Sequence, residues 1–163
     1  MESSRVVEVC NTCRSVIVFE ESICELFRKL DKCERFRIGD GDLSISLISR
    51  QKMKAIHAKF LGDSSLTDVI TFQGDSDLNF SGEILICPLY AFEQSKIYQT
   101  TFREEIKLYL IHGYLHLCGL EDKTEKEARH MRDGEAFCMN FLGDYSLQIF
   151  LRSDEIHPKY FQI

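Results

Sequence analysis

Apolar positions along the chain follow two spacings, one typical of helices and one typical of strands. Apolar residues at helical spacing predict five helices, over residues 20–30, 50–60, 89–98, 102–117 and 125–142. Short alternating or continuous apolar runs predict strands, at residues 6–10, 15–19, 43–47, 67–72 and 83–87. Helices and strands mix without regular alternation, so we expect an α+β fold in which helices pack on a small mixed sheet.

Polar residues mark where several of these helices begin. Thr101 and Thr124 are each followed three residues later by a glutamate, which is the pattern of a capping box. The helix over 50–60 carries apolar side chains at helical spacing, and we expect Met53 and Phe60 on its inner face. The boundaries and the buried face of a helix are thus both predicted from local pattern.

The length of the chain suits one domain. We interpret residues 1–163 as a single domain with its own core. Residues 144–163 are mixed and polar apart from one apolar cluster, Ile149-Phe150-Leu151. We therefore expect 144–163 to be a C-terminal tail that packs in part.

The net charge of −6 and the cysteine pattern narrow the class of protein. A general nucleic-acid or membrane binder is more often basic, so this charge counts against broad electrostatic binding, although it leaves room for a local basic groove. Seven scattered cysteines suit a reducing compartment better than a disulfide framework. The chain has no apolar run of about 18 residues and no signal-peptide pattern, so we expect no membrane span and a cytoplasmic location.

Two histidines stand four residues apart in the apolar helix over 102–117. Positions i and i+4 lie on one helix face, so His112 and His116 can reach a single point. Gly119 suits a left-handed helix stop, after which the chain can bring Asp122 back to that point. Two imidazoles and a carboxylate form a three-ligand set for one Zn²⁺ ion with a fourth position open to water. The alternative is a pair of half-buried structural histidines, which the apolar surroundings disfavour because an unpaired imidazole is costly there.

Two further positions on this helix bear on its chemistry. Glu105 lies seven residues before His112 on nearly the same face, which suggests a catalytic role in supporting the site or handling protons. The alternative is a solvated glutamate whose charge suits the start of a helix. Common zinc proteases place a glutamate directly after the first histidine, where this chain has Gly113. The glycine lowers the expectation of a peptidase without removing it.

The motif around the histidines resembles that of a known family. The segment HGYLHLCGLED, residues 112–122, is similar to the HGxLHLxGYDH hallmark of the YbeY family of bacterial endoribonucleases. TDVITF at 67–72 resembles the family's TDVLSF, GEILIC at 82–87 resembles its GDIVIC, and Glu105 falls where the family has a glutamate. The resemblance covers about residues 43–142.

The resemblance implies a metal-dependent endoribonuclease with a zincin-like metal-site helix. Its substrate would be single-stranded ribosomal RNA in small-subunit maturation, and its partners the ribosomal subunit or assembly proteins. Two alternatives stay open. One is a zinc metallopeptidase or other hydrolase, and the other is a non-catalytic ribosome-assembly factor with a structural metal. Whether the nucleophile is metal-bound water or the RNA 2′-OH also stays open.

Two positions depart from the family pattern. The family's third histidine falls on Asp122, which is an acceptable zinc ligand and neutralises one metal charge, with His130 as the fallback. The arginine that many members carry before the TDV segment is matched here by Leu61. If that arginine holds phosphate, another group must do so in this chain. The basic candidates are Arg103, Lys123, Arg129 and Arg132.

Overall fold

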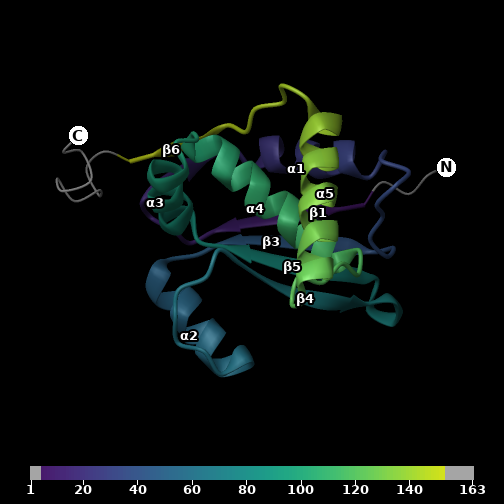
Figure 1. The fold of residues 1–163 in the computed structure, drawn as a ribbon, viewed down its shortest axis with the longest axis horizontal. Coiled ribbons are helices and arrows are strands. Elements are labelled where there is room, and N and C mark those ends of the chain that lie inside the picture. Colours follow the sequence, from purple (N-terminus) through teal and green to yellow (C-terminus); the bar gives the residue numbers. More distant parts are fainter. Residues whose placement is uncertain (1–4, 153–163) are drawn as a thin grey trace.

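A computed structural model describes residues 5–152, and Figure 1 shows their arrangement. Over these residues every predicted helix and strand is present, with bounds that differ by a few residues. The strands are β1 (Val7–Asn11), β2 (Val16–Val18), β3 (Asp42–Leu47), β4 (Val69–Asp75), β5 (Phe80–Ile86) and β6 (Ile149–Leu151). The helices are α1 (Glu20–Leu30), α2 (Arg50–Leu61), the short 3-10 helix η1 (Ser76–Leu78), α3 (Pro88–Tyr98), α4 (Phe102–Leu117) and α5 (Glu125–Leu142).

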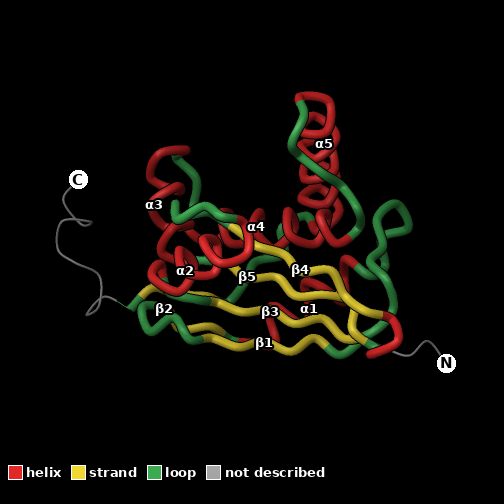
Figure 2. Tube along the Cα trace, turned by 90° about the horizontal axis from the view of Figure 1, so that it is seen from below, coloured by secondary structure: helices red, strands yellow, loops and turns green. Residues whose placement is uncertain are grey.

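Four strands form a mixed sheet with the order β1-β3-β5-β4, seen side by side in Figure 2. β1, β3 and β5 are parallel, whereas β4 pairs antiparallel with β5 after the short η1 connection. Parallel neighbours need a crossover, and α1 and α2 lie in the connections that follow β1 and β3. The predicted α+β fold with a small mixed sheet is confirmed. Within the described residues, β4 is an edge strand with one unpaired side.

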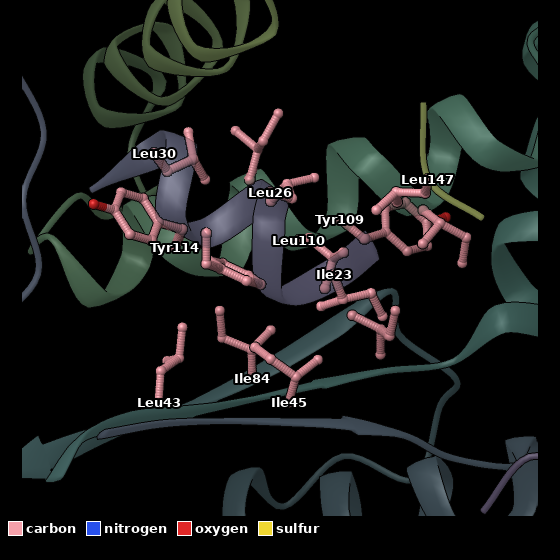
Figure 3. Close-up of a cluster of buried hydrophobic side chains, with 14 of the residues drawn as sticks. Ile23, Leu26, Leu30, Leu43, Ile45, Ile84, Tyr109, Leu110, Tyr114 and Leu147 are labelled. Atoms are coloured by element: carbon pink, nitrogen blue, oxygen red, sulfur yellow. The ribbon is translucent and has the colours of Figure 1, made fainter. Parts of the chain in front are cut away.

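The main hydrophobic core lies between the sheet and helices α1 and α4 (Figure 3). Leu43, Ile45 and Ile84 extend from the sheet toward Leu26 of α1 and Tyr114 of α4, and each of the five is at most 1% exposed. α4 also contacts α3 and α5, which suits a helix that is apolar on most of its sides. No helix among residues 5–152 combines the length and apolar character that crossing a bilayer needs. The central position of α4 holds its side chains in fixed places.

A second, smaller apolar cluster lies on the other face of the sheet. Its buried members are Ile48, Met53, Ile70, Leu85 and Cys87. Of these, only Met53 comes from α2, which stands apart from the other helices in Figure 1. Phe60 is 55% exposed, so its predicted position on the inner face is wrong. The reason is that α2 enters this cluster near its N-terminus, while its C-terminal turn extends past the cluster.

The segment after α5 belongs to the fold as far as residue 152. β6 pairs antiparallel with β2, with Leu151 opposite Val16. Leu147 and Ile149 are each 1% exposed. Residues 144–152 of the predicted tail therefore pack onto the protein, because their apolar cluster completes a two-stranded sheet. Residues 153–163 lie outside the described part.

Both predicted capping boxes are present. The Thr101 hydroxyl accepts from the Glu104 N–H at 3.2 Å, and the Glu104 carboxylate accepts from the Thr101 N–H at 2.9 Å. Thr124 and Glu127 repeat this pair at 3.2 and 2.9 Å. The hydrogen bond from the threonine N–H holds the pKa of both glutamates below its usual value. Local sequence alone thus fixes the start of α4 and of α5.

Candidate metal centre

Helix α4 ends in a turn that folds the chain back over its last residues. Gly119 has φ = +95°, a conformation that glycine adopts without strain. The Gly119 N–H donates to the His116 carbonyl at 2.9 Å and the Leu120 N–H to the Leu115 carbonyl at 3.0 Å, which are the hydrogen bonds of a Schellman motif. The predicted helix stop at Gly119 is confirmed, and it directs residues 120–122 back toward the histidines.

Three side chains converge beside this turn. Nε2 of His112 lies 3.0 Å from Nε2 of His116. A carboxylate oxygen of Asp122 lies 3.4 Å from the first nitrogen and 3.6 Å from the second. Ligand atoms about 2.0–2.1 Å from a tetrahedral Zn²⁺ are about 3.3 Å from one another. The three predicted ligands therefore have nearly this spacing, whereas His130 is exposed on α5 and lies outside the group.

Hydrogen bonds decide which nitrogen of each imidazole faces the group. Nδ1 of His112 lies 2.5 Å from a Glu135 oxygen, and Nδ1 of His116 lies 2.9 Å from the Leu120 carbonyl oxygen. A carboxylate and a carbonyl only accept, so each Nδ1 carries a proton and each neutral ring keeps a lone pair on Nε2. With both rings neutral, two lone pairs and the Asp122 carboxylate face one another. This donor set fits a bound cation.

Glu135 is the residue of this site that sequence reasoning missed. It lies on α5 with its side chain 19% exposed, against the 15% exposed side chain of His112. Burial lowers the pKa of His112, but the hydrogen bond to Glu135 and the charges of Asp68, Glu135 and Asp122 together raise that pKa above its usual value. The sequence did contain a signal, because Glu135 stands one turn after Met131 on the inward stripe of its helix, where an acid needs a partner.

Asp68 is a second acid near His112, just before β4. Its carboxylate accepts hydrogen bonds from the Val69 N–H at 2.8 Å and from the Thr67 hydroxyl at 3.1 Å. Burial raises the pKa of Tyr109, one turn before His112, and the charge of Asp68 raises it further. An acid held in this position adds negative potential around the centre, which favours a cation.

The sequence around this centre is shared with a known family. The family profile described as Endoribonuclease YbeY matches residues 10–143, well over half of the chain. This protein belongs to the YbeY family. The resemblance seen in the motifs is confirmed, and the match extends toward both termini beyond residues 43–142.

Individual YbeY proteins show how far the similarity reaches. A protein named Endoribonuclease YbeY from Thermotoga neapolitana is 37% identical over 112 residues, covering 66% of this chain and 74% of its own. The protein of that name from Christiangramia forsetii is 36% identical, covering 58% and 66%. The solution structure of TM1509 from Thermotoga maritima is 26% identical with a TM-score of 0.59, covering 86% of this chain and 91% of that one.

Gly113, between the two histidines of this YbeY chain, is a point of close contact between α4 and the sheet. A Cβ at this position would lie 2.6 Å from Cγ2 of Ile84 and 3.2 Å from Cγ2 of Val69. The first distance is shorter than real Cβ contacts, so the neighbouring side chain would have to move. A glutamate such as zinc proteases carry here has no room, and this disfavours the peptidase alternative.

Glu105, the predicted catalytic residue, lies in the first turn of α4 and is 5% exposed. Its carboxylate accepts a hydrogen bond from the Thr100 hydroxyl at 2.6 Å. It does not belong to the three-ligand group of His112, His116 and Asp122. The alternative of a solvated glutamate is wrong because the side chain is buried. The catalytic role of Glu105 stays a prediction.

Three of the four basic candidates for a phosphate contact have partners that are not among the ligand residues. Arg103 donates to the Ile149 carbonyl, Lys123 pairs with Glu121 and Arg129 pairs with Glu125. Arg132 is exposed on α5. Leu61, which matches the family arginine, is 63% exposed at the end of α2.

Proposed function

We propose that this protein is a metal-dependent endoribonuclease that cleaves single-stranded ribosomal RNA during maturation of the small ribosomal subunit. Two findings support this function together. The chain belongs to a family whose members are named endoribonucleases, and it holds two imidazole lone pairs and a carboxylate at metal-ligand spacing. The second observation carries the proposal, because it supplies a chemical basis for hydrolysis at this site.

The proposed ligands of one Zn²⁺ ion are His112, His116 and Asp122. When bound, the ion supplies a Lewis acid that polarises a phosphodiester and stabilises its developing charge. Glu135 holds the ring of His112, and the Leu120 carbonyl holds the ring of His116, so that both Nε2 atoms stay directed at the ligand position. Asp122 contributes a negative charge where the family motif has a neutral histidine, so it leaves less net positive charge at the centre.

The acidic net charge of −6 suggests that other molecules help this protein to reach its RNA. An acidic protein is repelled by RNA over most of its surface, so we expect the ribosomal subunit or its assembly proteins to guide it to its substrate. With such a substrate we expect the protein in the cytoplasm, which also suits its scattered cysteines.

The test is cleavage of labelled ribosomal RNA by purified protein, with and without a chelator. We expect chelator-sensitive cleavage by wild type, none by His112→Ala, and full cleavage by His130→Ala, a matched histidine outside the group. Labelled casein in parallel reactions should stay intact.

Two outcomes would replace the proposal. Chelator-sensitive casein cleavage with RNA untouched would indicate a peptidase. Metal-loaded wild type that binds ribosomal RNA but never cleaves it would indicate an assembly factor with a structural metal.

A further inference from the structure

Helix α2 carries cations and no acids, although the protein as a whole is acidic. Its twelve residues contain four lysines or arginines and no aspartate or glutamate. Arg50, at its start, pairs with Glu93 at 2.5 Å. Lys52, Lys54 and Lys59 are exposed, and none of them pairs with a carboxylate among residues 5–152. These three cations therefore face solvent without a neutralising partner in the described protein.

Phe60 adds an exposed aromatic ring to this basic helix. Its ring contacts that of Phe72 in a T-shaped arrangement with centroids 5.0 Å apart, yet 55% of the residue stays exposed. The Lys59 ammonium lies 5.2 Å from the centroid of the Phe60 ring. Exposed lysines beside an exposed ring are the means by which proteins hold single-stranded nucleic acid, since cations contact phosphates and the ring stacks on a base.

Edge strand β4 connects this helix with the metal centre. Phe72 and Gln73 are consecutive in β4, so their side chains lie on opposite faces of the sheet. On one face Phe72 contacts Phe60, and on the other Gln73 Nε2 donates to the His116 carbonyl at 3.1 Å. Figure 1 shows α2 and α4 on opposite sides of the sheet. A chain that crosses the edge of β4 can therefore contact α2 and the metal centre at once.

We propose that the α2 surface, formed by Lys52, Lys59 and Phe60, holds the single-stranded RNA substrate on one side of β4 while the metal centre acts on the other. The inference rests on the proposed function, because the substrate of an endoribonuclease is the polyanion that this charge complements. The protein as a whole carries a net charge of −6, so the unpaired cations of α2 are a local exception that favours the approach of RNA at this helix.

Charge reversal on α2 is the first test. Binding of a labelled single-stranded RNA to the full-length, metal-containing protein is followed by anisotropy from low to high salt, with the RNA confirmed intact afterwards. Lys52→Glu/Lys59→Glu should raise Kd at low salt at least about tenfold and lower the salt slope by about 1.4, since each lost phosphate contact removes about 0.7. The matched control is Lys32→Glu/Lys96→Glu, which makes the same charge change at two other exposed lysines and should bind like wild type.

Removal of the aromatic ring is the second test. Phe60→Leu keeps an apolar side chain against Phe72, so the fold is retained, but it removes the stacking face. Kd should rise about tenfold with an unchanged salt slope, because stacking does not release counterions. The control is Tyr98→Ala, which removes an aromatic residue that is 66% exposed on α3 and should leave Kd unchanged. In cleavage assays both α2 variants should raise KM and retain kcat.

The outcomes separate this inference from the proposed function. If His112→Ala abolishes cleavage but both α2 variants bind and cleave RNA like their controls, the α2 surface is not the RNA site and faces another partner. If wild type binds RNA through α2 but cleaves none, α2 is the RNA-binding surface and the proposed function fails. If the charge-reversal variant of α2 and its charge-matched control lose RNA affinity equally, the inference about α2 is also overturned. The effect would then come from net charge alone.

Discussion

The two ends of helix α4 differ in what surrounds their polar side chains. At the C-terminal end, His112 and His116 direct their Nε2 atoms toward Asp122, whose side chain is 41% exposed. Their Nδ1 atoms already have partners, so in the neutral rings each Nε2 offers its lone pair to a ligand. The two Nε2 atoms and the Asp122 carboxylate can therefore still bind a ligand, and solvent can reach them.

The N-terminal end buries charged side chains more completely. Glu105 is 5% exposed and Lys107 is 6% exposed. Glu105 accepts from the Thr100 hydroxyl, and Lys107 Nζ donates to the Gly143 and Tyr145 carbonyls at 3.0 and 2.9 Å. The comparison teaches that burial of a charged residue does not by itself mark a site. A site also needs ligand atoms that the protein leaves unused.

The largest effect is expected from Asp122→Ala, which removes the exposed ligand of the C-terminal end. Metal affinity should fall more than about 100-fold, because the loss of an outer-sphere partner already costs about 10–100-fold. Elemental analysis of purified protein and titration with a competing chelator measure this. Asp133→Ala, which changes another exposed aspartate, should keep the metal. A metal content that Asp122→Ala leaves unchanged would remove this residue from the ligand set.

A matched pair of glutamate substitutions tests the comparison most directly. Glu135→Gln removes the charge that holds the His112 ring, so metal affinity should fall about 10-fold or more. Glu105→Gln changes a buried glutamate at the N-terminal end of α4, so metal affinity should match wild type. The free energy of unfolding should fall by about 1–2 kcal/mol. Metal titration and urea unfolding of the two variants give both quantities.

The same pair also tests the catalytic role predicted for Glu105. Lost cleavage by Glu105→Gln at full metal content and with an intact fold would support that role. Equal metal affinity in the two variants would contradict the conclusion that only the C-terminal end of α4 supports metal binding.

An effect on stability alone is expected from Lys107→Met. Burial lowers the pKa of Lys107, and its ammonium donates to two carbonyls. The substitution leaves these carbonyls, one of them at the end of α5, without their donor. The free energy of unfolding should fall by about 1–3 kcal/mol with metal affinity unchanged. Weaker metal binding would mean that the two ends of α4 are coupled.

The smallest effect concerns the capping box at the start of α4. The pKa of Glu104 is lower in the folded than in the unfolded protein, because its ionised form accepts the Thr101 N–H. Its contribution to stability is therefore complete above the unfolded-state pKa and is lost as pH falls through the folded-state pKa. Glu104→Gln should cost about 0.3–1 kcal/mol at neutral pH. Its unfolding curve should converge with that of wild type in acid, and a difference independent of pH would contradict the assignment.

Much of the fold could be predicted because its signals are local. The capping boxes at Thr101 and Thr124 and the helix stop at Gly119 each depend on residues within one or two turns. Phe60 was placed wrongly because helical spacing shows which side chains share a face, but not how far the rest of the protein extends beneath that face. The exposed ring on α2 was therefore visible only in the structure.

The sequence by itself determined that His112 and His116 share a helix face, since the i, i+4 relation is a property of any α-helix. It also brought Asp122 within reach, through a glycine turn three residues before it. Only the tertiary structure decided that Glu135, 23 residues after His112, holds that imidazole, because this contact exists only when α5 packs on α4. It likewise placed Gln73 of β4 on the His116 carbonyl and Phe72 on α2. Contacts between distant segments depend on how elements pack, and the spacing of residues within one element does not contain that information.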